Sequence, residues 1–307
     1  MQMESGSINY EYLVNQIQRN LPTLPTIVNE LTNVLQNPDA STFAVEDVMT
    51  ADQSMTMKIL RVANTSFYRQ SGRERVTDAN EAIGTLGFEK IRNVVLTTSV
   101  FKMFSGPSAE QKFSLQGLWK HCLGVASASR CVANYLGKSW HERAYTCGLV
   151  HDIGKVARFK LDESEETQAF IDDSQTSLDK KINFFKSELI NQSPRHDYLG
   201  YLICKNWGLS SFVEGVVRWH HEPNPENRQK VTSEEAHELI DVVIFANWAV
   251  NEQKFGFSGH ETPDKPSDAL LSRLNLHSSQ VDQISLDIEN ELKMTEDFCN
   301  LLDSGGM

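Results

Sequence analysis

Apolar residues recur every three or four positions along almost the whole chain of 307 residues. This is the spacing of one helix face, whereas a half-buried strand alternates apolar and polar residues. No alternating stretch of any strength is present in the sequence. In LPTIVNELTNVLQN, one predicted helix face carries Leu24, Ile27, Val28, Leu31, Val34 and Leu35. The chain therefore predicts an all-α fold.

Turn and capping residues divide this pattern into separate helices. Asp78 and Glu81 form a pair typical of a helix start, and Gly87 is placed to end that helix. Three further stretches, 139–142, 211–214 and 232–235, have the spacing of capping boxes. Helices are also predicted over 43–51, 54–64, 88–104 and 114–136, and between 193 and 208. The polar, acidic stretch 161–180 is interpreted as a surface insertion.

Two stretches rich in Gly, Pro and Ser indicate internal boundaries. The first is FSGPSAEQ at 104–111, and the second is HETPDKPSDA at 260–269. They predict an N-terminal helical lobe over 1–105, a helical core over 106–260, and a linker with a helical tail over 261–307. The tail has sparse apolar residues, which suits a lid or a contact surface.

Composition narrows the classes of function. The formal net charge is −12, and no run of Lys and Arg is present, which disfavours nucleic acid as a partner. No apolar stretch reaches the ~18–20 residues of a membrane span, and the N-terminal residues do not resemble a signal peptide. The five cysteines form no CxxC pair, as expected of buried thiols in a reducing compartment. We expect a cytoplasmic protein without membrane contact.

The stretch GLVHDIGK at 148–155 ends an apolar helical run with a His-Asp pair. Three interpretations of His151 and Asp152 remain open. They could form a working metal site, the remains of one, or two polar residues that cap a helix.

Histidines add weight to the metal interpretation. Helical spacing directs His121, His151, His196 and His220 toward the interior on four separate helices, and His221 is adjacent. Any one of them alone is best explained as a core histidine bonded to a backbone carbonyl. Four together with Asp152 would satisfy one another poorly without a cation. A nitrogen and oxygen ligand set favours Fe, Mn, Zn or Ni. The remaining histidines are interpreted as surface residues: His141, His237, His260 and His277.

The order of these motifs resembles that of the HDOD family, a branch of the HD superfamily of helical metal-dependent phosphohydrolases. It runs H121, H151-D152-I-G-K155, E188, H196 and H220-H221. Three stretches of the first third agree independently: LPTLPTIVNELTNVLQNPDAS, ADQSMTMKILRVANTSFY and EAIGTLGFEKIRNVVL. The resemblance covers roughly residues 16–250. It implies an HD-superfamily helical core with an N-terminal helical lobe.

The resemblance also implies ligand sets for one or two divalent metal ions. By position, the first metal matches His121, His151 and Asp152. The second matches Asp152, His196, His220 and His221. Lys155 matches a lysine that contacts substrate phosphate in the branch that hydrolyses cyclic di-GMP.

One ligand of the first metal departs from the superfamily pattern. The last aspartate of the superfamily aligns with Asn247, which lies on the inward stripe of its helix. Asp241 is six positions away, so it turns about 240° around the helix and falls off that stripe. A neutral amide is a poor ligand for a dication. The first metal position is therefore incomplete, and the second is complete.

The sequence leaves three interpretations of this protein open, and we favour the first. It is a regulatory protein that interacts with other signalling proteins on a degenerate HD scaffold, is catalytically inactive, and holds one metal. The alternative is a phosphohydrolase acting on a nucleotide or cyclic dinucleotide, with Lys155 as a catalytic residue. The His-His pair and Lys155 support the enzyme, whereas Asn247 and a missing Gly-Tyr-Pro signature argue against it. In a third interpretation the histidines bond only to each other and to water.

Overall fold

The structure is a computed structural model that describes residues 8–20, 30, 34, 41–50, 53–65, 75–104, 113–161 and 165–303. Within these ranges the regular elements are all helices and no strand is present. The all-α prediction is confirmed. The helix predicted over 24–35 falls outside the described ranges, apart from two of its residues.

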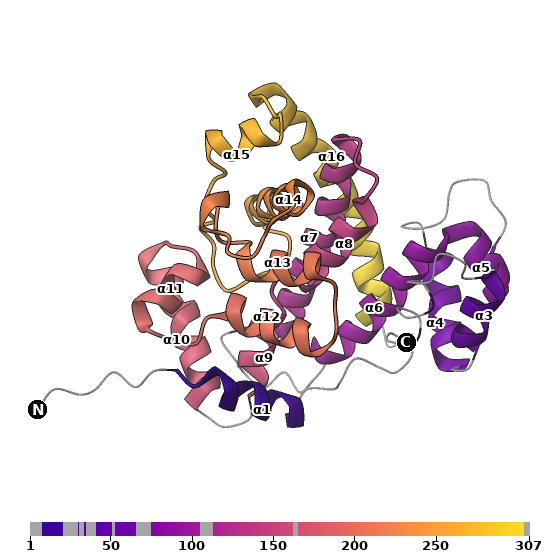
Figure 1. The fold of residues 1–307 in the computed structure, drawn as a ribbon, viewed down its shortest axis with the longest axis horizontal. Helices are drawn as coiled ribbons and strands as arrows, with labels where there is room; N and C mark the ends of the chain where they lie inside the picture. The colour runs from indigo at the N-terminus through magenta and orange to yellow at the C-terminus, as the bar shows by residue number, and fades with distance from the viewer. Residues whose placement is uncertain are drawn as a thin grey trace, which may run out of the picture.

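The N-terminal helices form a group at one end of the molecule, on the right in Figure 1. They are α3 (Thr42–Thr50), α4 (Gln53–Ala63), α5 (Ala79–Leu86) and α6 (Phe88–Phe104). The predicted ends of α5 are confirmed. The Asp78 carboxylate accepts the backbone N–H of Glu81 at 2.8 Å, and Gly87 follows the helix with a φ of 78°. The left-handed conformation of Gly87 suits a residue without a Cβ atom.

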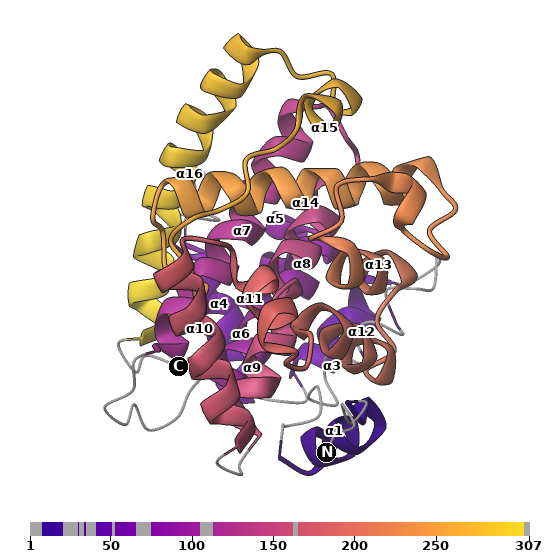
Figure 2. The same ribbon diagram turned by 90° about the vertical axis from the view of Figure 1, so that its left-hand side faces the viewer.

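The centre of the molecule is the pair α7 (Leu115–Tyr135) and α8 (His141–Val150). Their backbones approach closely because Gly148 has no side chain, and a Cβ atom there would lie 2.7 Å from the carbonyl oxygen of Val125. Helix α14 (Glu234–Glu252) crosses this pair, and α16 (Ser278–Asp303) runs along α7 (Figure 2). Helix α6 attaches to α8 through Asn93, whose amide donates to the Glu142 carboxylate at 2.8 Å.

A second layer of short helices packs beside α8. It contains α9 (Ile153–Lys160), α10 (Glu165–Lys180), α11 (Phe184–Asn191), α12 (His196–Asn206) and α13 (Ser211–Trp219). Helix α1 (Tyr10–Asn20) lies against α9 and α12 rather than with α3–α6 (Figure 1). Its Leu13 is buried among Ala157, Leu161, Leu199 and Ile203.

Stretch 161–180 is not a surface insertion, and this prediction was wrong. Phe170 and Asp173 on α10 are fully buried. The Asp173 carboxylate accepts a hydrogen bond from the Arg158 guanidinium at 2.8 Å, and Phe170 packs against other aromatic rings of the core. A buried arginine needs such a partner, so the acidic residue is part of the core.

Two of the three predicted capping boxes are also absent. Trp140 and Ser210 hold the N-cap positions of α8 and α13, and neither side chain makes a capping bond. In the third, the cap of α14 is Ser233, one residue later than predicted, and its side chain accepts from the N–H of Ala236.

The C-terminal tail is integrated into the core. Chain segment 255–267 has no helix and follows α14; we name it the strap. It contacts the second layer through Ser258, which accepts from Lys155 of α9, and through Asp264, which accepts from Lys186 of α11. After α15 (Asp268–Arg273), α16 buries Ile284, Ile288 and Leu292, and Thr295 donates to Ser127 of α7 at 2.9 Å.

A short 3₁₀ helix, Pro225–Asn227, precedes α14. None of the described helices is long and apolar enough to cross a bilayer.

Candidate metal centre

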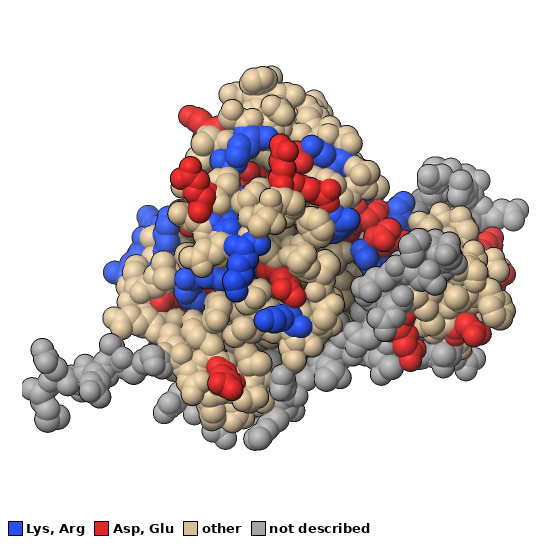
Figure 3. Space-filling view, viewed as in Figure 1, with Lys and Arg blue, Asp and Glu red and all other residues tan. Residues whose placement is uncertain are grey.

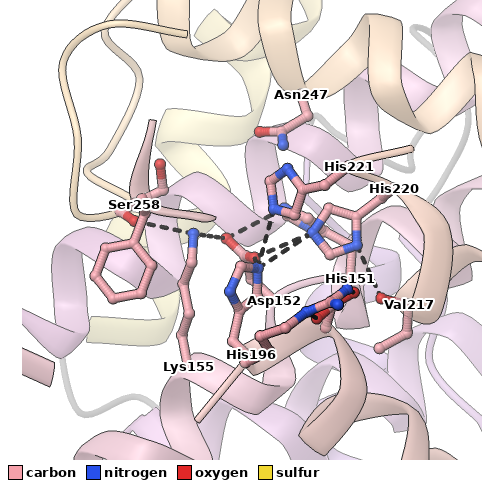
Figure 4. Close-up of polar contacts among 12 residues, drawn as sticks. His151, Asp152, Lys155, His196, Val217, His220, His221, Asn247 and Ser258 are labelled. Atoms are coloured by element: carbon pink, nitrogen blue, oxygen red, sulfur yellow. Dashed lines mark hydrogen bonds and ion pairs between the residues drawn. The ribbon is translucent and has the colours of Figure 1, made fainter. Parts of the chain in front are cut away.

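The His-Asp pair lies at the junction of α8 and α9. His151 follows the last residue of α8, and Asp152 holds the N-cap position of α9. The Asp152 side chain makes no capping bond. It points instead into a buried group of imidazoles (Figure 4). Capping therefore does not explain this residue.

Four side chains converge at the second predicted position. Asp152 meets His196 from the first turn of α12 and the adjacent His220 and His221 from the end of α13. The His196 Nε2 atom lies 3.2 Å from Asp152 Oδ1, 3.4 Å from His220 Nε2 and 3.0 Å from His221 Nε2. Donor atoms at about 2.0–2.1 Å from a tetrahedral ion lie about 3.3 Å apart. The spacing therefore fits ligands of a single ion.

Hydrogen bonds on the far side of three rings fix their tautomers. The Nδ1 atoms of His151, His196 and His220 face the Gly148 carbonyl, the Glu188 carboxylate and the Val217 carbonyl at 2.7–2.9 Å. Because these partners only accept, each Nδ1 carries the proton and each Nε2 presents a lone pair. The lone pairs face one another and Asp152. This arrangement fits a cation at their centre and is unfavourable without one.

Electrostatics keeps His220 and Asp152 in the forms that bind metal. Burial lowers the pKa of His220 to about 4, despite its bond to Asp152, so its imidazole is neutral. Burial alone would raise the pKa of Asp152, but nearby His151 and Lys155 hold that pKa well below its usual range. For His196, burial lowers the pKa, but the Glu188 and Asp152 carboxylates together raise it by more, so the pKa of this ring lies above its ordinary value.

The first predicted position has fewer ligands. His121 Nε2 and His151 Nε2 lie 3.8 Å and 3.3 Å from Asp152 Oδ2. Both ring nitrogens of His121 and the Nε2 atom of His151 are buried without a hydrogen-bond partner in the described part of the chain. The Lys155 ammonium lies 2.8 Å from the same Asp152 oxygen, so a metal here would face a competing positive charge.

Buried charged residues behind His196 hold its ring in place. The Glu188 carboxylate accepts from the His196 ring and from its backbone N–H at 2.8 Å and 3.0 Å. Glu188 also accepts a hydrogen bond from Arg158, which in turn donates to Asp173. All three charged residues are fully buried. The sequence motif included Glu188, but its role depends on the partners that the fold brings to it.

Lys155 is held by the strap. Its ammonium donates to Asp152 at 2.8 Å and to the backbone carbonyl of Ser258 at 3.0 Å (Figure 4). The side chain is about 1% exposed, so it does not face solvent. Contact between Lys155 and a substrate phosphate stays a prediction, and it would require the strap to move.

His260 was predicted to lie on the surface, and that prediction was wrong. The residue is 5% exposed, and its Nδ1 atom lies 3.2 Å from the Ser258 hydroxyl. The cause is the return of the strap over the site, which helical periodicity cannot reveal. His260 lines a cavity of about 120 Å³ together with Asn183, His220, His221, Asn247 and Asn251. This cavity opens onto the ligands of the second position.

Asn247 lies above the ring of His221 (Figure 4). The structure thus brings it to the site, as its helix face predicted. Asp241 does not reach the site, because it is buried in a pair with Arg228 and is bonded to Arg273 at 2.7 Å. Among the described residues, both candidate ligand groups contain Asp152 as their single carboxylate.

Several solved structures resemble this fold, and three of them are as follows. An HDOD domain protein of Geobacter sulfurreducens is 23% identical, with a TM-score of 0.71 over 96% of this chain and 99% of its own. A candidate signal transduction protein of Marinobacter aquaeolei is 16% identical, with a TM-score of 0.73 over 97% and 67%. A candidate phosphohydrolase of Shewanella amazonensis is 19% identical, with a TM-score of 0.64 over 92% and 97%.

Sequence comparison agrees with the structural likeness. The chain spans about half the length of the curated relative that it matches, an uncharacterized protein of Treponema pallidum. The two are 22% identical over 263 residues, which is 85% of this chain and 47% of the relative. Residues 21–223 match the HDOD domain family. Because this match covers more than half of the chain, the protein belongs to the HDOD family.

Proposed function

We propose that this HDOD protein is a regulatory interaction protein that holds one metal ion and does not turn over a substrate. The metal would be bound by Asp152, His196, His220 and His221. Fe, Mn, Zn and Ni all suit this set of nitrogen and oxygen donors. When bound, it would tie the start of α9 to α12 and α13, and so fix the shape of the second layer.

Among the described residues the site has a single carboxylate, and this observation carries the proposal. Two-metal hydrolysis needs ions a few Å apart that clamp both the attacking and the leaving oxygen. Here Asp152 would have to be a ligand of both ions, and the Lys155 ammonium already contacts its Oδ2 atom. Asn247, at the position of the superfamily's last aspartate, supplies no negative charge. The second position keeps a full ligand set and the first does not.

We propose other cytoplasmic signalling proteins as partners, and neither nucleic acid nor a membrane. The net charge of −12 and the interspersed positive and negative side chains on the face in Figure 3 support this choice. A nucleic-acid site would need a broad field of Lys and Arg.

Elemental analysis of protein purified without added metal tests the metal. We expect close to one metal ion or less per chain in the native protein, and none in Asp152→Ala. Asp172→Ala is the matched control, because Asp172 is exposed on α10 and bonds only Gln168 among the described residues. Metal-free native protein that also fails to take up Zn²⁺ or Mn²⁺ would exclude this part of the proposal.

Hydrolysis assays test the absence of turnover. We expect no cleavage of cyclic di-GMP, nucleotides or a generic phosphodiester above a metal-only blank. The alternative function, a metal-dependent phosphohydrolase, is favoured by the intact His220-His221 pair and by Lys155. Robust turnover by the native protein that Asp152→Asn abolishes would establish the enzyme instead.

A further inference from the structure

We propose that a groove between α12, α13 and the turn before α14 binds an acidic segment of a partner protein, in which carboxylates are interspersed with apolar side chains. The groove measures about 600 Å³ and shares no lining residue with the cavity beside His220 and His221. Binding sites of ~300–1,000 Å³ are typical of specific ligands. This inference rests on the proposed function, since it names the class of partner for a protein proposed to act by binding others.

Partly exposed aromatic rings line the groove. Tyr198 and Tyr201 of α12 stack with 6.1 Å between their ring centroids. Phe212 and Trp219 come from the two ends of α13, where each packs against the core on one side and stays partly exposed on the other. Aromatic residues of this kind are enriched at protein interfaces, because they bury a large apolar area on binding. The groove therefore suits apolar side chains of a partner.

Positive charge predominates along the same groove. Its cationic lining residues are Lys205, Arg218 and Lys230, whereas Glu214 is the single acidic residue of the lining. Lys205 and Lys230 are exposed, and neither forms an ion pair with a residue that the structure describes. Lys and Arg side chains lie over α12 and α13 on the face in Figure 3. The groove is thus complementary in charge to carboxylates.

Arg218 contributes a charge that its own ion pair does not cancel. Its guanidinium donates to the Asp197 carboxylate, which also accepts from Arg195. Two guanidiniums thus share one buried carboxylate and leave one positive charge in excess. The centroids of the Trp219 and Tyr198 rings lie 4.2 Å and 5.3 Å from the Arg218 guanidinium, so aromatic faces hold it in place. A fixed guanidinium with further N–H donors suits a carboxylate.

The charges also decide between an acidic protein segment and nucleic acid. The chain carries a net charge of −12, but charges farther away than the Debye length of ~8 Å are largely screened at physiological salt. The local cations therefore determine what the groove attracts. Nucleic acid is bound through many phosphate contacts, and three cations with Glu214 among them offer few. A segment with a few carboxylates needs no more than these.

The test is the fluorescence anisotropy of a short labelled peptide in which Asp and Phe alternate, titrated with the full chain at physiological salt. We expect saturable binding, and none of the matching peptide in which Lys replaces Asp. Combining Lys205→Glu with Lys230→Glu should weaken binding at least about tenfold, because each change replaces an attraction with a repulsion. The control combines Lys180→Glu with Lys293→Glu. It changes the net charge equally at exposed positions of α10 and α16 and should bind as the native protein does.

A second variant obstructs the groove without changing its charge. Gly215 lines the groove on α13, and a Cβ atom there would meet only the Val231 side chain, at an ordinary contact distance of 3.9 Å. Gly215→Leu should therefore weaken peptide binding at least as much as the two charge reversals. Its Tm should not fall, because leucine favours a helix more than glycine does. Native affinity in this variant would place the peptide elsewhere and overturn the inference.

Metal content measured on the same samples separates this inference from the proposed metal. Metal-free protein that binds the peptide in the groove contradicts the metal and supports the inference. Metal-loaded protein that binds no peptide, or that loses no affinity on the two charge reversals, overturns the inference alone. Tighter binding of a single-stranded oligonucleotide than of the Asp and Phe peptide would assign the groove to nucleic acid and overturn the choice of partner.

Discussion

At the scale of single residues, Glu188 is placed to control the metal without touching it. It fixes the Nδ1 proton of His196, so the Nε2 lone pair faces Asp152. Replacing a partner of a metal-binding histidine typically costs 10–100-fold in metal affinity. We expect Glu188→Gln to weaken Zn²⁺ or Mn²⁺ binding by about this factor, measured by competition with a chromogenic chelator.

A matched variant separates this positioning role from general damage to the core. Asp173→Asn breaks the other half of the same buried ion pair, because Asp173 and Glu188 both bind Arg158. It should lower the free energy of unfolding while metal affinity stays within about threefold. Equal losses of metal affinity in the two variants would mean that Glu188 acts through stability alone.

At the scale of elements, the strap depends on one glycine where it contacts α7. Gly256 has a φ of 76°, and a Cβ atom there would lie 2.3 Å from the backbone nitrogen of His121. Left-handed backbone costs a residue with a side chain ~1–2 kcal/mol, and overpacking adds ~1–3 kcal/mol. We expect Gly256→Ala to lower the free energy of unfolding by ~2–5 kcal/mol in urea titrations.

The control for this prediction is Gly208→Ala. Gly208 has a similar φ of 67°, but nothing lies within 4 Å of its Cβ position. This variant should lower the free energy of unfolding by only the ~1–2 kcal/mol that a left-handed backbone costs a residue with a side chain. Equal losses of unfolding free energy in the two variants would mean that the strap does not need close contact with α7.

The same elements show how far periodicity predicts structure. The helices α4, α6 and α7 were predicted within two residues at each end, because a continuous apolar stripe reports burial directly. The capping box at 139–142 failed because a serine caps only where the backbone turns suitably, and the turn here places Trp140 at the cap. Stretch 161–180 was misread because the burial of Asp173 depends on Arg158, a partner distant in sequence.

The site could be predicted in part for a related reason. The histidines lie on helices or directly after them, and the inward faces of these helices are visible in the sequence, so their convergence could be anticipated. The position of the strap could not, because segment 255–267 has no periodicity. The glycines at 256 and 259 were the available signal, and both have positive φ and close neighbours. His260 was therefore missed.

At the scale of the whole molecule, the proposed metal joins parts of the chain that are far apart in sequence. Asp152 begins α9, His196 begins α12, and His220 follows α13. Helix α13 packs on α8 and on α14, and α12 packs on α9 and α13, so the site lies where the second layer meets the centre. An unfolded chain has no such arrangement, and a ligand that binds only the folded state stabilises it by mass action.

Chelation should therefore lower the melting temperature of the native protein. Free metal at 100 times its Kd stabilises the folded state by about 2.7 kcal/mol, so EDTA should lower the Tm by several degrees in scanning calorimetry. Re-addition of Mn²⁺ or Zn²⁺ should restore it. Asp152→Ala should melt at one temperature with and without EDTA, because it lacks the shared carboxylate. A native protein whose Tm does not respond to EDTA, yet retains its metal on elemental analysis, would place that metal outside the cluster of Asp152.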